Sequence, residues 1–199
     1  MKLYNCGIQG KKFRVIRDIY SGNRANVLIG KNISPEFDIL SGVLQGSKLG
    51  PLLFSIFLND LLEKLNDSNL GAQIDILTIS TLGFADDIVL ISDSPSKLQK
   101  LINICFEWSE QNHMEFKISK CKVMVLNRSS TNLFFTLNNE QLEVVQSYKY
   151  LGVTFNNKRL TTLYTEHFSK VKQKANKRLQ CIRHFGFHKD GLTPETVIK

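Results

Sequence analysis

The segment Phe84-Ala85-Asp86-Asp87 places two adjacent carboxylates between two apolar runs, Ile74–Leu82 and Ile88–Ile91. This pattern predicts a strand hairpin that is buried on both faces and carries the acidic pair at its tip. Taking an ionised carboxylate out of water costs several kcal/mol, and a divalent cation removes that cost. Asp86 and Asp87 are therefore the first candidates for a metal site, and hard oxygen ligands favour Mg²⁺.

The hydrophobic pattern of the whole chain mixes helical and strand periods, so we predict an α+β fold. Two helices are clearly marked: one follows the loop Gly42–Pro51, with proline in its first turn, and the other opens at Ser94-Pro95. Two further helices are expected at Lys11–Tyr20 and Thr162–His184. Strands are expected at Ala25–Ile29, Phe37–Leu40, Cys121–Leu126, Leu133–Leu137, Leu142–Val145 and Tyr148–Phe155.

Charge is distributed unevenly along the 199 residues. The formal net charge is +8, and the stretch from Lys158 to Lys189 alone holds nine basic residues against a single acidic one, Glu166. A near-neutral body with one basic arm is the distribution expected for a protein that binds an anionic polymer. The cysteines show no metal-ligand spacing, and the longest apolar stretch, Leu49–Leu58, is too short to cross a bilayer. We therefore expect an intracellular protein, in the cytoplasm or the nucleus, with no transmembrane segment and no membrane partner.

Four short motifs follow one another along the chain. Gly42–Asp60 reads GVLQGSKLGPLLFSIFLND, and it is followed by Phe84–Asp87, Lys120-Cys121-Lys122 and Tyr150-Leu151-Gly152-Val153. In this order and spacing they resemble the reverse transcriptase domain, an RNA-directed DNA polymerase, of non-LTR (LINE-type) retrotransposons. The resemblance implies a partial polymerase palm at residues 1–155, with a ferredoxin-like antiparallel sheet and helices on one face. It also implies the start of a helical thumb in a basic helical segment at residues 156–199.

The resemblance assigns roles to individual residues. Asp86 would be a ligand of catalytic Mg²⁺ or Mn²⁺ ions, with Asp87 as a neighbouring acidic ligand. The nucleotide and the template would contact Gln45, Gly46, Phe84, Ala85 and Lys120, and the primer grip would consist of Tyr150, Leu151 and Gly152. The nucleic-acid backbone would run along Lys170, Lys174, Lys177 and Arg178. The implied partners are an RNA template, a DNA primer and deoxynucleoside triphosphates, while the oligomeric state stays open.

Each assignment has a plainer alternative that the residues leave open. The acidic pair can be a solvated turn, Gln45-Gly46 an ordinary loop before a helix, and Lys120 a surface lysine. Tyr150 can be a core side chain, and the basic helix can be a solvated amphipathic face.

A second metal-binding carboxylate has no clear counterpart in this sequence. In the family it lies upstream of the Gln-Gly loop, between a strand and a helix, and neither Asp18 nor Asp38 has that context. We therefore expect an incomplete polymerase, truncated at both ends, that binds metal weakly and is inactive alone. The alternatives are a non-catalytic nucleic-acid-binding remnant and the product of a decayed element with no function.

Overall fold

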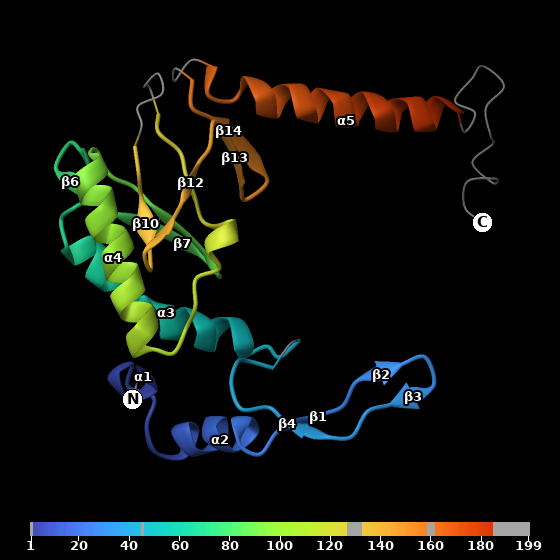
Figure 1. Ribbon diagram of the computed structural model, residues 1–199. Helices are drawn as coiled ribbons and strands as arrows, with labels where there is room; N and C mark the ends of the chain where they lie inside the picture. Colours follow the sequence, from blue (N-terminus) through green and yellow to red (C-terminus); the bar gives the residue numbers. More distant parts are fainter. Residues whose placement is uncertain (1, 45, 127–132, 159–161, 185–199) are drawn as a thin grey trace. The chain divides into compact units, whose positions relative to one another are not determined.

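A computed structural model of the chain describes residues 2–44, 46–126, 133–158 and 162–184 (Figure 1). These residues divide into two compact units, with the boundary between residues 115 and 116. Helices and short strands are mixed, as the α+β prediction requires. The described strands pair two by two, in six antiparallel ladders and one parallel ladder. The larger antiparallel sheet of a palm and the domain boundary after residue 155 stay predictions.

The first unit contains four of the described helices and four antiparallel strand pairs. Its helices are α1 (Lys2–Asn5), α2 (Gly10–Tyr20), α3 (Gly50–Asp67) and α4 (Pro95–Gln111). The first two strand pairs are β1 (Arg24–Ala25) with β4 (Phe37–Asp38), and β2 (Leu28–Ile29) with β3 (Asn32–Ile33). The other two pairs are β5 (Ala72–Ile74) with β6 (Leu77–Ile79), and β7 (Thr81–Phe84) with β8 (Asp87–Leu90).

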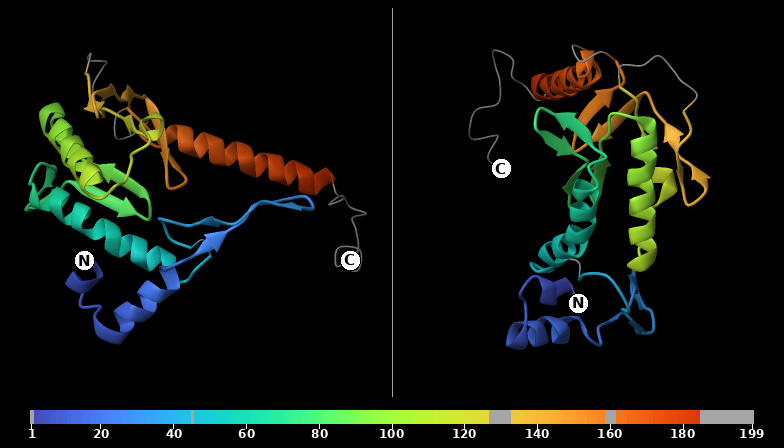
Figure 2. Two further views of the ribbon diagram at one scale, coloured as in Figure 1. Left: turned by 60° about the horizontal axis from the view of Figure 1, so that its bottom comes forward. Right: turned by 90° about the vertical axis from the view of Figure 1, so that its left-hand side faces the viewer.

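The core of the first unit lies where α3 and α4 pack side by side (Figure 2). Leu61 and Leu65 of α3 and Leu101 of α4 are fully buried, and Trp108 of α4 is 1% exposed. Leu61 and Leu65 are four positions apart and Leu101 and Trp108 are seven apart, and both spacings put side chains on one helix face. Pro51 lies in the first turn of α3, which confirms that prediction.

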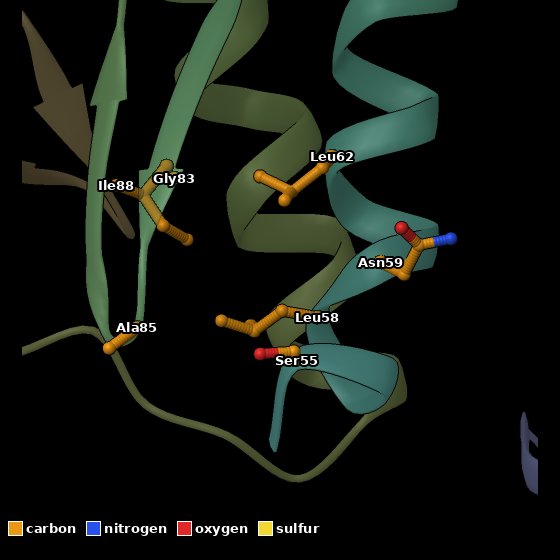
Figure 3. A pocket seen from close by; sticks show the side chains of 7 residues that line it. All are labelled: Ser55, Leu58, Asn59, Leu62, Gly83, Ala85 and Ile88. Carbon is orange, nitrogen blue, oxygen red and sulfur yellow. The ribbon is translucent and has the colours of Figure 1, made fainter. Parts of the chain in front are cut away.

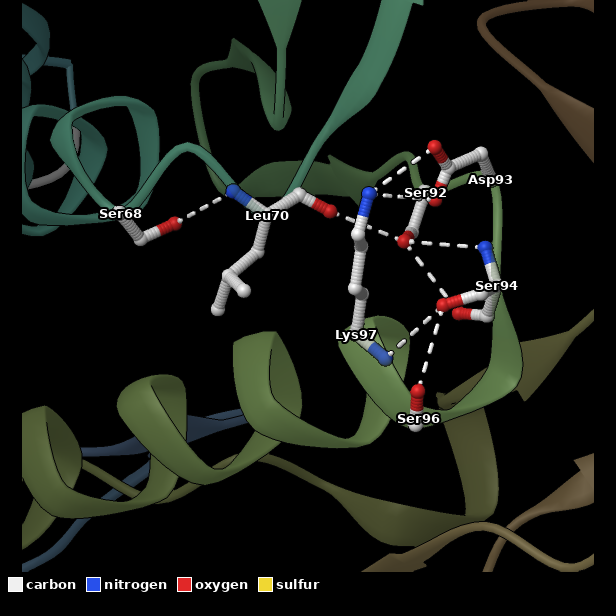
Figure 4. A network of polar contacts seen from close by, with 7 residues as sticks. All are labelled: Ser68, Leu70, Ser92, Asp93, Ser94, Ser96 and Lys97. Carbon is white, nitrogen blue, oxygen red and sulfur yellow. Dashed lines mark hydrogen bonds and ion pairs between the residues drawn. The ribbon is translucent and has the colours of Figure 1, made fainter.

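A polar network fixes the start of α4 (Figure 4). The hydroxyl of Ser94 accepts the backbone N–H of Lys97 at 3.3 Å, so Ser94 caps the helix as predicted. Lys97 also pairs with Asp93, with Nζ 2.9 Å from Oδ1. The hydroxyl of Ser92 donates to the carbonyl of Leu70 at 2.9 Å and thereby ties the chain after β8 to the segment before β5. Caps of this kind stabilise a helix by about 1 kcal/mol.

The expected burial of the acidic hairpin on both faces was wrong, and its apolar flank forms more than one strand. The apolar run Ile74–Leu82 is divided between two hairpins, because Asp75 takes a left-handed φ of 54° and turns the chain between β5 and β6. The second hairpin, β7–β8, is not buried on both faces: Leu82 is 51% exposed and Phe84 is 63% exposed. The argument from burial of the two charges therefore does not apply to the pair at its tip.

The second unit contains one described helix, α5 (Thr165–His184), and a 3₁₀ turn, η1 (Ile118–Lys120). Its one parallel ladder joins β9 (Lys122–Val123) to β12 (Glu143–Val144). Its antiparallel pairs are β10 (Thr136–Leu137) with β11 (Glu140–Gln141), and β13 (Ser147–Tyr150) with β14 (Val153–Asn156). Phe135, Leu142 and Leu163 are buried in this unit. The described residues hold no helix that is both long and apolar enough to cross a membrane.

Candidate functional site

The acidic pair lies at the tip of the β7–β8 hairpin. Phe84 and Asp87 form the last pair of the ladder, so Ala85 and Asp86 make a two-residue loop. All four residues are exposed. Ala85 has a φ of 54°, a left-handed conformation that costs a residue with a side chain about 1–2 kcal/mol. Strain of this kind persists where the surrounding structure or a function requires it.

The two faces of this hairpin have different surroundings. Pairing across the ladder puts Gly83 and Ile88 on one face and Phe84 and Asp87 on the other. The first face lies against α3, since a Cβ added at Gly83 would come 3.2 Å from Cδ1 of Leu62. Asp87 therefore belongs to the face that points away from α3.

A pocket of about 150 Å³ lies between α3 and the hairpin (Figure 3). Leu58 and Leu62 point from α3 toward the hairpin, whereas Asn59 points away from it. The hydroxyl of Ser55 is already bound to the carbonyl of Pro51 at 3.0 Å. The complete lining is Ser55, Leu58, Asn59, Leu62, Gly83, Ala85 and Ile88. Because this lining holds no carboxylate, the pocket is packing space beneath the acidic tip and not a metal site.

The loop before α3 depends on glycine. Gly42 has a φ of 93° and Gly46 a φ of 80°, conformations that glycine adopts at little cost. The carbonyl oxygen of Leu44 lies 3.3 Å from a Cβ added at Gly50, so the loop folds closely onto the first turn of α3. Gln45 lies outside the described residues. This loop and the acidic hairpin thus belong to the same unit and are joined by α3.

By themselves, the carboxylates of Asp86 and Asp87 do not make a complete ligand set for a metal ion. The described residues contain no group of three or more His, Cys, Asp or Glu side chains that could hold a metal ion. A protein usually binds Mg²⁺ through one or two carboxylates, while water and substrate phosphates complete the octahedron. Asp86 and Asp87 are hard oxygen donors in exposed positions, so they fit Mg²⁺ as the protein's part of such a shared set.

The other expected site residues lie in the second unit. Lys120 is an exposed residue at the end of the 3₁₀ turn. Leu151 and Gly152 form the turn between β13 and β14, with φ values of 45° and 85°. The expected single strand Tyr148–Phe155 is therefore a hairpin. Tyr150 is half-buried in this hairpin.

The basic helix α5 is exposed along most of its length. Lys170, Lys174, Lys177 and Arg178 are all exposed, and so are apolar side chains such as Phe168, which is 68% exposed. The spacing of the three lysines places them on one helix face. This arrangement can present a row of positive charges to a polyanion.

One acidic residue of the basic arm has a role that the sequence did not reveal. Glu166 accepts hydrogen bonds from Lys170 Nζ at 2.5 Å and from the hydroxyl of Ser147 at 2.9 Å. The hydrogen bond from Lys170, and then that from Ser147, holds the pKa of Glu166 below its ordinary value. Nearby, Nδ1 of His167 accepts the backbone N–H of Thr154 at 3.3 Å. These contacts attach the first turn of α5 to the β13–β14 hairpin, and only the three-dimensional pairing could have shown them.

The sequence of the chain is similar to those of known proteins. Residues 2–155 match the family described as reverse transcriptase (RNA-dependent DNA polymerase). The chain is 25% identical over 211 residues to a Retrovirus-related Pol polyprotein from type-1 retrotransposable element R2 of Popillia japonica, covering 94% of this chain and 34% of that protein. It is 32% identical over 142 residues to the RNA-directed DNA polymerase from mobile element jockey of Drosophila melanogaster, covering 68% and 15%.

A third relative is the Retrovirus-related Pol polyprotein from type-2 retrotransposable element R2DM of Drosophila melanogaster. It is 28% identical over 153 residues, which cover 70% of this chain and 14% of that protein. The chain thus spans about a third or less of the length of these relatives. Since the family match covers most of the chain and these relatives come from non-LTR retrotransposons, the chain belongs to the reverse transcriptase family of RNA-directed DNA polymerases.

Proposed function

We propose that this chain is part of a polymerase that extends a DNA primer on an RNA template. The observation that carries the proposal is the two-residue tip Ala85-Asp86, which presents Asp86 and Asp87 on the exposed end of a hairpin that packs on α3. The substrates are then a primer 3′-hydroxyl and deoxynucleoside triphosphates, and pyrophosphate is released. We also propose that the protein acts inside the cell, in the cytoplasm or the nucleus.

The proposed residues bind and orient the substrates. Mg²⁺, or Mn²⁺ in its place, would supply the positive charge that stabilises the attacking and leaving oxygens. Asp86 and Asp87 offer the oxygen ligands for it. Gly46, with no side chain and a φ of 80°, lets a base or sugar approach the backbone closely. Phe84 offers an exposed apolar surface beside the tip.

The remaining proposed residues contact the nucleotide, the template and the primer. Gln45 would join Gly46 and Ala85 at the nucleotide and template, and Lys120 would bind the triphosphate as a point charge. The turn at Tyr150, Leu151 and Gly152 would press on the primer end, and the thumb would begin with α5.

We further infer that the chain alone polymerises poorly, if at all. Two-metal phosphoryl transfer needs ligands for a second ion as well, and the described residues bring no third carboxylate into a metal-binding group with Asp86 and Asp87. Catalysis of phosphoryl transfer depends on charge stabilisation by fully held metal ions, and each factor of ten in rate is about 1.4 kcal/mol of barrier. Incomplete ligation therefore predicts weak metal binding and a loss of several decades in rate.

The test combines primer extension with metal binding on the same full chain. Asp86→Asn should abolish Mn²⁺-induced broadening of the NMR signals around the tip, and it should lower any extension of a DNA primer on RNA by about a hundredfold or more. The matched control is Asp75→Asn, which changes an exposed aspartate in the loop of the neighbouring β5–β6 hairpin. Broadening that persists in Asp86→Asn would refute the metal site. Robust DNA synthesis by the unaltered chain would refute the inference that the chain alone polymerises poorly.

A second candidate function is nucleic-acid binding without catalysis. The observation that favours it is the exposed row of Lys170, Lys174 and Lys177 on α5, which does not depend on the acidic pair. Such binding should survive Asp86→Asn, which separates this function from polymerisation.

A further inference from the structure

A single ammonium group lies against α3 and α4 in the first unit, partly open to solvent. Nζ of Lys2, in α1, donates hydrogen bonds to Oδ1 of Asp60 and to the carbonyl of Phe57, both at 2.8 Å. The same Nζ lies 4.1 Å from the ring centroid of Phe57 and 4.6 Å from that of Trp108. The cation thus meets a carboxylate, a carbonyl and two aromatic rings.

The walls of this cage are held together independently of the cation. Nε1 of Trp108 donates to Oδ1 of Asp60 at 3.0 Å, and the Phe57 and Trp108 rings meet edge to face at 5.4 Å. Trp108 is 1% exposed, so its ring is fixed by the packing of α3 against α4. A site whose walls are already in place loses little freedom when a ligand enters.

The charge of the cage is suited to a cation. Burial by itself raises the pKa of Asp60, but the hydrogen bonds from Lys2 and Trp108 outweigh it and hold the pKa of this carboxyl below its ordinary value. Asp60 is therefore ionised at neutral pH. Aromatic faces add to the attraction, because their quadrupoles are negative above the ring.

Lys2 ties the short helix α1 to α3 and α4, and Tyr4 of the same helix meets Phe13 edge to face with ring centroids 4.7 Å apart. α1 is four residues long and contains no buried residue. The side chain of Lys2 is itself 26% exposed, so solvent reaches the cage. A cation that holds so short a segment, and that solvent can reach, can be exchanged for another of the same chemistry.

We propose that Phe57, Asp60 and Trp108 form a binding site for a primary ammonium group, and that Lys2 is the chain's own ligand for it. The ligand class follows from the acceptors: a primary ammonium carries three N–H donors for the carboxylate and the carbonyl, whereas a quaternary ammonium carries none. This site is independent of the proposed polymerase function. Without the ammonium group of Lys2, the cage is open to a primary alkylammonium ion.

The test uses Trp108, the only tryptophan in the chain, as the reporter. The full chain with Lys2→Met is titrated with n-butylammonium chloride, and the Trp108 emission should change and saturate in the millimolar range expected for so small a ligand. The unaltered chain, whose cage is already filled, should not respond over that range. Adding Asp60→Asn to Lys2→Met should weaken binding by about tenfold or more, since a charged hydrogen-bond acceptor is lost.

Three controls separate the site from general effects. Sodium chloride at the same ionic strength, tetramethylammonium chloride and n-butanol should leave the emission of Lys2→Met unchanged, and Lys2→Arg, which keeps a cation, should retain the emission of the unaltered chain. An equal response to tetramethylammonium or butanol, or no saturable response to butylammonium, would overturn the proposal. If Lys2→Met is unfolded in buffer, the readout is recovery of its far-UV circular dichroism: recovery with butylammonium but not with sodium chloride supports the site, and no recovery rejects it.

Discussion

Position 71 requires glycine because there is no room for a side chain, and not because of its backbone conformation. A Cβ at this position would lie 2.2 Å from the carbonyl oxygen of Ile79 and 2.5 Å from the backbone nitrogen of Ser80. Both are backbone atoms, so the β5–β6 hairpin has to shift to make room. We expect Gly71→Ala to lower the free energy of unfolding of the first unit by about 1–3 kcal/mol, measured by chemical denaturation.

Gly83→Ala is the matched control for that substitution. Its added Cβ would meet only the Cδ atoms of Leu62, at 3.2 and 3.3 Å, and a flexible side chain can move away. The loss of stability should therefore stay below about 1 kcal/mol. Equal losses in the two variants would show that space at Gly71 is not the cause.

Residues that act over short sequence distances were the predictable ones. Ser94 caps α4 by accepting the backbone N–H of Lys97, three positions away, and Asp86 and Asp87 are adjacent. Both the helix cap and the acidic pair could therefore be predicted from the sequence alone. Lys2 and Asp60 are 58 positions apart, and no local pattern announces their pairing. The left-handed φ of Ala85 was equally invisible, because alanine carries no preference for that conformation.

Among the elements, length decided what could be predicted. Helices α2 to α5 each run for at least 11 residues, so their apolar spacing repeats often enough to be recognised. The described strands run for two to four residues, too few for an alternating pattern to show. The four-residue α1 was missed for the same reason. The expected strand Tyr148–Phe155 became a hairpin because its turn, Leu151-Gly152, interrupts an otherwise continuous run.

The attachment of α5 to β13 should depend on pH through Glu166. Its pKa in the folded protein lies below its ordinary value of 4.5, so the stabilising contribution is complete above that value and is lost as the pH falls through the folded pKa. Hydrogen exchange of the first turn of α5 should therefore accelerate as the pH is lowered below about 4.5, after correction for the intrinsic rate. In Glu166→Gln, protection should be lower at neutral pH and nearly flat over the same range.

An exposed glutamate of the same unit provides the comparison for this pH dependence. Glu140→Gln removes a carboxylate from β11 and should leave the pH profile of α5 as it is in the unaltered chain. A profile for Glu166→Gln that parallels the unaltered chain would assign the acid sensitivity to other groups.

At the scale of the whole molecule, the order of the motifs along the sequence predicted the family. The pairing of the strands could not be predicted from the sequence. The Gln-Gly loop, the acidic pair and the Tyr-Leu-Gly turn could be recognised because each is local and their order is linear. Which strand lies beside which is a non-local property, and a chain of short strands leaves it undetermined until the packing is known. The charge distribution, by contrast, can be counted along the sequence. It therefore predicted directly that the chain binds an anionic polymer.

That expectation can be measured as a salt dependence. Each Lys or Arg that neutralises a phosphate releases counterions, so replacing Lys174, Lys177 and Arg178 with Gln should reduce the slope of log K against log salt by about 2–3 for a nucleic-acid duplex. Lys170 is left intact to preserve its pair with Glu166. The control replaces Lys11, Lys12 and Arg14, exposed on α2, which lowers the net charge equally. Fluorescence anisotropy of a labelled RNA–DNA hybrid gives both slopes. If the two triple variants lose affinity alike, net charge and not α5 governs binding, because a specific row of phosphate contacts must be sensitive to where the charge is removed.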